Sequence, residues 1–125
     1  MRSSSGRYSN INILSVLGDD VMSHNGEFCE GEVFNVTCAV DQVMQVRSAR
    51  YGRMQLGRCV EQTYGTFPCS VDVTAHVDGE CGGRRNCAFP VISLKKQQSP
   101  CSIDLRSYLE VEYICTSGKY SCTKY

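Results

Sequence analysis

Histidine is scarce in this 125-residue chain, and no two cysteines are spaced as Cys-x-x-Cys. Only His24 and His76 occur, so neither a thiolate-rich zinc site nor a Cys/His zinc site has its usual ligand spacing. A Gly-x-Ser-x-Gly motif is also absent, and nucleophilic catalysis therefore has no candidate group. We expect no metal, no cofactor and no enzymatic activity.

Net charge is absent as well, because 13 Lys and Arg residues balance 13 Asp and Glu residues. Such a chain has no overall field that would attract nucleic acid or an anionic membrane. No apolar stretch is long enough to cross a membrane, and residues 1–10 contain no apolar signal segment. Any charged partner must therefore be met by a local patch, and we expect neither a nucleic-acid partner nor a membrane span.

Cysteine, in contrast, is abundant, with nine residues in one short chain. In the absence of metal-ligand spacing, a disulfide framework is the better interpretation, and it requires an oxidising compartment. We therefore expect an extracellular protein, secreted or part of a cell-surface ectodomain. On this reading the chain is a piece separated from its signal segment.

Two segments that end in cysteine alternate as β-strands do. "EVFNVTC" places Phe34 and Cys38 on one face, and "YLEVEYIC" places Leu109, Val111 and Cys115 on one face. A Cys38–Cys115 bridge across the core of a β-sandwich would suit this parity. Residues 41–53 and 86–94 are predicted as two further strands, the second at an edge or bulge because it contains a proline.

The rest of the chain is divided as follows. Residues 1–10 are predicted to be a flexible N-terminal segment, 11–28 a short helical lead, 29–115 the folded domain and 116–125 a C-terminal tail. The segment "SVDVTAHVDGEC" at 70–81 fits both a strand and a helix, and periodicity alone does not decide between them.

Five stretches in order carry a family resemblance: "CEGE" at 29–32, "SARYGR" at 48–53, "ECGGRRNC" at 80–87, "SPC" at 99–101 and "YLEVEYIC" at 108–115. Residues 29–115 resemble the galactose/rhamnose-binding lectin domain of the sea urchin egg lectin type. The resemblance implies a mainly β, α+β fold: a disulfide-locked antiparallel β-sandwich with one main helix, at the undecided segment, and short extra helical turns. It also implies four bridges and leaves Cys122 over. These bridges are Cys29–Cys59, Cys38–Cys115, Cys69–Cys101 and Cys81–Cys87.

The resemblance further implies a shallow sugar site that needs no metal. Glu30 would accept hydrogen bonds from sugar hydroxyls, Tyr51 would form a wall for the ring, and Gly52 and Arg53 complete the Tyr-Gly-Arg motif. The alternative for Glu30 is a solvated loop acid, and for Tyr51 a half-buried packing residue.

This chain departs from the family pattern in three places. Arg50 stands where the family usually has Asn, and Ser99 where it usually has Asp. In "CSIDLRSYL" the family glycine is replaced by Ile103 or Asp104, and Arg106 or Ser107 stands near the family lysine. We expect a remodelled site with weak or absent monosaccharide affinity. The candidate ligand-binding residues are Glu30, Arg50, Tyr51, Gly52, Arg53, Ser99, Asp104 and Arg106.

Two surface features accompany this site. On a regular strand Arg47 and Arg53 would point one way and Arg50 the other. Some of the basic residues could still converge on an anion-binding surface for sulfated glycan or an acidic protein. The alternative is scattered, solubilising charge. The set in question is Arg47, Arg50, Arg53, Arg58, Arg84, Arg85, Lys95 and Lys96. Separately, Asn35-Val36-Thr37 is an N-glycosylation acceptor with outward parity.

The lead "LSVLGDDVMSHNGEFCEGE" is similar to that of cell-surface axon-guidance receptors of the enhancer-of-ventral-axon-migration type. The predicted function is therefore an extracellular recognition module of a receptor that binds a protein ligand or co-receptor, which sulfated glycan could assist. The alternative is a soluble secreted lectin for galactose or L-rhamnose. A secreted toxin or inhibitor on the same scaffold is a third class.

Overall fold

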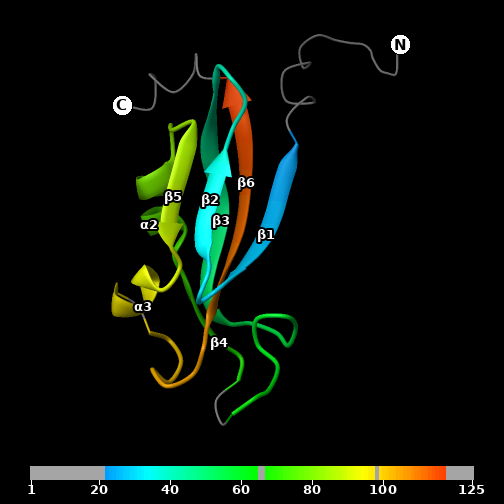
Figure 1. Cartoon of the computed structure of the whole chain (residues 1–125), viewed down its shortest axis with the longest axis vertical. Helices are drawn as coiled ribbons and strands as arrows, with labels where there is room; N and C mark the ends of the chain where they lie inside the picture. Colours follow the sequence, from blue (N-terminus) through cyan, green and yellow to red (C-terminus); the bar gives the residue numbers. More distant parts are fainter. Residues whose placement is uncertain (1–21, 65–66, 98, 118–125) are drawn as a thin grey trace, which may run out of the picture.

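The computed structural model describes residues 22–64, 67–97 and 99–117 (Figure 1). A four-stranded sheet of order β1-β6-β3-β4 and a two-stranded sheet of β2 and β5 are both antiparallel. The elements are β1 (Ser23–Cys29), β2 (Val33–Thr37), β3 (Gln42–Arg53), β4 (Cys69–Asp72), α2 (Thr74–Cys81), β5 (Asn86–Pro90), α3 (Ser93–Gln97) and β6 (Tyr108–Ser117). The expected antiparallel, mainly β fold is confirmed.

The core lies between the two sheets, and it is formed by the side chains that alternate to the inner face of each strand. Phe34 on β2 is fully buried and packs edge-on against Phe28 of β1, with ring centroids 4.9 Å apart. Met44 of β3 and Val111 of β6, from the larger sheet, belong to the same core cluster as Phe34. Figure 1 shows β2 and β5 alongside β3 and β6 as a second layer. Burial of these apolar side chains is the main driving force for closing the sandwich.

The undecided segment contains both kinds of structure. Cys69–Asp72 forms β4, and Thr74–Cys81 then forms α2, so the helix implied by the resemblance is confirmed for its second part. The helix covers the stretch of β3 that β4 does not reach. The Thr74 hydroxyl accepts a hydrogen bond from the Ala49 N–H at 2.9 Å, and the Asp78 carboxylate accepts one from the Val46 N–H at 3.1 Å.

All four implied bridges are present, and Cys38–Cys115 joins the two sheets with its Cα atoms 5.7 Å apart. A native disulfide contributes roughly 2–4 kcal/mol, so the bridges account for a large share of the stability of a small domain. Cys122 lies outside the described residues. The other three bridges are Cys29–Cys59, Cys69–Cys101 and Cys81–Cys87.

The expected helical lead is wrong for residues 23–28. These residues belong to β1, which pairs with β6 from Ser23 opposite Ile114 to Cys29 opposite Tyr108. As a strand, this segment pairs with the backbone groups along the edge of β6, which a helix in this place would leave without strand partners. Residues 1–10 and 11–21, the rest of the expected flexible segment and lead, lie outside the described residues, as do residues 118–125 of the expected tail.

A β-bulge in β3 changes which arginines face the solvent. Met44 and Val46 are buried before the bulge, but after it the buried side chains include Tyr51 and Arg53. The register shifts at Arg47, which is left without a residue opposite it on β6. Because one extra residue reverses the alternation, Arg47 is exposed and Arg53 is not. The expectation that these two share a face is therefore wrong.

Candidate functional site

Gly52 brings the end of β3 close to β4. Its φ is +151°, and a Cβ atom at this position would lie 2.2 Å from the Cys69 carbonyl oxygen. A side chain cannot fit against a backbone atom at that distance, so the position requires glycine. The close pairing holds the end of β3 against β4, and the side chains of Tyr51 and Arg53 on either side of Gly52 are buried.

Tyr51 is a core residue and has no exposed face. Its side chain is 0% exposed, so the expected ring wall for a sugar is not available in this structure. Burial raises the pKa of Tyr51 to about 12, and the negative charge of the nearby Glu30 acts in the same direction. The physical reason is again the bulge, which directs this side chain into the sandwich.

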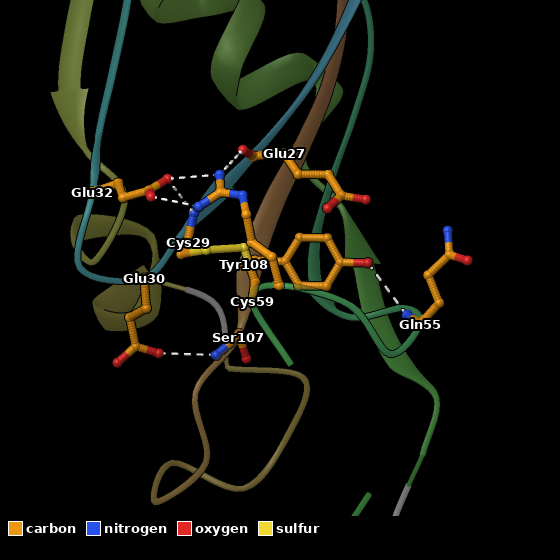
Figure 2. Close-up of a disulfide and its surroundings, with 9 residues drawn as sticks. Glu27, Cys29, Glu30, Glu32, Gln55, Cys59, Ser107 and Tyr108 are labelled. Carbon is orange, nitrogen blue, oxygen red and sulfur yellow. Dashed lines mark hydrogen bonds and ion pairs between the residues drawn. A yellow bond between two sulfur atoms is a disulfide. The ribbon is translucent and has the colours of Figure 1, made fainter. Parts of the chain in front are cut away.

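The Glu30 carboxylate is held by groups of the domain itself. The Lys95 ammonium lies 3.1 Å from both Glu30 oxygens. The Ser107 N–H donates to Oε1 at 2.9 Å, a hydrogen bond drawn in Figure 2. The two charged side chains are only 12% and 16% exposed. Lys95 also donates to the Leu105 carbonyl oxygen at 3.1 Å. The pair thus ties the turn after β1 to α3 and to the loop before β6.

A second ion pair lies beside the first, on the same turn. The Glu32 carboxylate accepts hydrogen bonds from Arg58 at 2.6 and 3.0 Å and from the Cys29 N–H at 2.8 Å. The guanidinium of Arg58, followed by that backbone N–H, lowers the pKa of Glu32 to about 2. Arg58 also donates to the Glu27 carbonyl oxygen, so it closes the Cys29–Cys59 corner shown in Figure 2.

Arg53 connects the loop after β3 to the loop before β6. It is 3% exposed, donates from Nη1 to the Arg106 carbonyl oxygen at 2.5 Å, and donates from Nη2 to the Gln62 carbonyl oxygen. Its Nε is buried and has no hydrogen-bond partner among the described residues. The guanidinium also lies 5.8 Å from the centre of the Tyr64 ring.

An open hollow of about 440 Å³ lies between these two loops, which occupy the lower half of Figure 1. We call it the arginine hollow. Its lining consists of Arg53, Arg58, Cys59, Val60, Glu61, Gln62, Tyr64, Asp104, Leu105 and Arg106. The structure therefore gathers three of the predicted ligand-binding residues, Arg53, Asp104 and Arg106, around one hollow.

The comparisons with known proteins agree with this architecture. Residues 36–115 match the model of the family described as D-galactoside/L-rhamnose binding SUEL lectin domain. The chain belongs to this family. It is 32% identical over 93 residues to L-rhamnose-binding lectin SML from Scomberomorus niphonius, an alignment that covers 70% of the chain and 44% of that protein. Latrophilin-like protein 1 from Caenorhabditis elegans is 26% identical over 92 residues, which cover 70% of the chain and 9% of that protein. The chain thus spans less than half of either relative.

Five of the eight candidate residues of this SUEL lectin domain do not line the hollow: Glu30, Tyr51 and Gly52, described above, and Arg50 and Ser99. Arg50 is exposed on the other face of β3 and donates to the Ser70 hydroxyl at 2.8 Å. The Ser99 hydroxyl donates to the Lys95 carbonyl oxygen at 2.7 Å, at the end of α3. Sequence reasoning missed Ser107 and the pairing of Lys95, since a contact between residues 30 and 95 has no local signal.

The basic residues of this SUEL lectin domain do not converge on one patch. Lys95 and Arg58 are paired with acids, and Arg53 is buried. The backbone of Arg84 and Arg85 bonds to β3 at Met44 and to the end of β2, far along β3 from Arg53. These contacts favour scattered charge over a single surface built from the whole set, and convergence of some of these residues on an anion-binding surface stays a prediction.

Within the described ranges, no cluster of His, Cys, Asp and Glu could hold a metal ion. No helix in the same ranges is both long and apolar enough to cross a membrane.

Proposed function

We propose that this SUEL lectin domain is the extracellular recognition module of a cell-surface receptor and binds a protein ligand or co-receptor. Its binding surface is made by the turn after β1, the loop after β3 and the loop before β6. A free monosaccharide is not its main ligand.

The engagement of Glu30 carries this proposal. A carboxylate that binds sugar must offer its lone pairs to hydroxyl groups, but here Lys95 contacts both oxygens and Ser107 contacts one. Three of the roughly four lone-pair positions of this carboxylate are therefore already used. Two neighbouring sugar hydroxyls could bind it only by displacing Lys95 or the Ser107 N–H. With Tyr51 in the core, the ring contact that would offset this loss is missing as well.

The surface beside Glu30 has the composition of a protein interface. Arginine and tyrosine are enriched at such interfaces, and the hollow presents Arg53, Arg106 and Tyr64 together. The likeness of the lead to guidance receptors supports a cell-surface parent protein.

The second candidate is a soluble lectin for galactose or L-rhamnose. It is favoured by the 32% identity to a protein named L-rhamnose-binding lectin SML. A soluble lectin of this kind would compensate for a weak site by using several copies.

Cell binding with sugar competition separates the two candidates. The folded domain, biotinylated and tetramerised on labelled streptavidin, is applied to a panel of cell lines, with and without prior trypsin treatment of the cells. We expect binding that trypsin abolishes and that excess L-rhamnose or D-galactose leaves unchanged. Loss of binding with either sugar would contradict the proposal and favour the soluble lectin. Domain that has been reduced and alkylated serves as the control for non-specific adhesion.

A further inference from the structure

The arginine hollow contains a buried cation without a counter-charge. The Arg53 side chain is 97% removed from solvent, yet its contacts are two carbonyl oxygens and an aromatic ring, with no carboxylate among the described residues. A buried charge is costly unless it is paired. The cost falls when an anion approaches, so this site favours a negatively charged ligand.

Arg53 also retains hydrogen-bonding capacity. A guanidinium has five N–H donors, of which two are used here, and Nε has no partner. Arg106 lines the same hollow, is exposed, and forms no ion pair in the described ranges. Three arginines line one space of about 440 Å³, which is large enough for a side chain, and Arg58 is the one of them that is already paired with an acid.

We propose that the arginine hollow binds the carboxylate of an aspartate or glutamate side chain carried by a protein partner. The inference rests on the proposed function and deepens it by naming the chemistry of the partner's anchor. The planar, forked geometry of the guanidinium matches a carboxylate.

The rim of the hollow selects a single carboxylate rather than a sulfated polysaccharide. Glu61 and Asp104 line it and form no ion pair in the described ranges, so they would repel a chain that carries many sulfates. Tyr64 and Ile103, a neighbour of Asp104, are 53% and 66% exposed. These apolar groups would pack against the side chains that flank an acidic residue in a protein.

The test observes Arg53 directly by NMR. Its buried Nε–H gives a side-chain signal that is followed while N-acetylglutamate is added at constant ionic strength. We expect a saturable shift with N-acetylglutamate and none with N-acetylglutamine. Removing the exposed partner with Arg106→Gln should weaken binding about threefold, since exposed charge pairs contribute about 0.2–1 kcal/mol. Arg47→Gln, which changes another exposed arginine, on the bulge of β3, should leave the affinity unchanged.

A gain of affinity provides an independent readout. Glu61→Gln removes a repulsive charge and should strengthen binding of N-acetylglutamate. The proposal is overturned if the Arg53 signal does not move, if N-acetylglutamine moves it equally, or if a heparin hexasaccharide binds there more tightly than N-acetylglutamate. Should cell binding resist sugar and remain intact in Arg106→Gln, this inference fails while the proposed function stands.

Discussion

Replacing Lys95 with methionine tests whether the Glu30 ion pair is a real structural element. Methionine keeps the length and apolar stem of the side chain but removes the ammonium, so Glu30 retains only the Ser107 N–H. The Glu30 side chain is 12% exposed and the Lys95 side chain 16%, so this ion pair lies between a fully exposed and a fully buried one. Exposed pairs contribute about 0–1 kcal/mol, whereas breaking a buried pair costs about 3–5 kcal/mol. We therefore expect Lys95→Met to lower the free energy of unfolding by about 2 kcal/mol.

The assay is urea unfolding followed by far-UV circular dichroism under non-reducing conditions. A double-mutant cycle with Glu30→Gln separates the pair from the contact of Lys95 with Leu105. We expect a coupling energy of about 1 kcal/mol or more, because the two side chains contact each other through both carboxylate oxygens. A coupling energy within about 0.3 kcal/mol of zero would refute the reasoning, since independent sites behave in that way.

Three further predictions follow from particular contacts. Gly52→Ala should lower the free energy of unfolding by more than about 3 kcal/mol in the same assay, because of backbone strain and overlap with β4. The control is Gly57→Ala, where a Cβ would meet no atom within 4 Å, and it should change the free energy of unfolding by less than about 1 kcal/mol. Equal effects of the two substitutions would contradict this. Because the pKa of Glu32 is lowered from 4.5 to about 2, its contribution to the free energy of unfolding is present above pH 4.5 and is lost as the pH falls toward 2. The ion pair with Arg58 is exposed, so this contribution is at most about 1 kcal/mol. In Glu32→Gln this acid dependence of the stability should disappear. Secretion from eukaryotic cells should attach a glycan at the exposed Asn35, seen as a mass that PNGase F lowers; an unchanged mass would count against it.

Much of the fold could be predicted because strand parity is local. The faces of β2 and of β6, and the burial of Met44 and Val46, follow from alternation along the chain. The disulfide pairing needed the family resemblance, since eight cysteines permit on the order of a hundred pairings.

The candidate site was harder to predict because non-local contacts decide it. One extra residue at Arg47 reverses the alternation, and it sends Tyr51 and Arg53 inward without any change in composition. The pairing of Glu30 with Lys95 joins residues 65 positions apart, which no periodicity records. The β1 strand was likewise hidden, because its partner β6 lies near the other end of the chain.

Titration calorimetry of the unmodified domain with L-rhamnose and with D-galactose tests most directly whether Glu30 is closed to sugar. Since Lys95 and Ser107 occupy its carboxylate, we predict no saturable heat for either sugar. Saturable binding of either one with a Kd below about 1 mM, or 4 kcal/mol of binding free energy, would contradict the account.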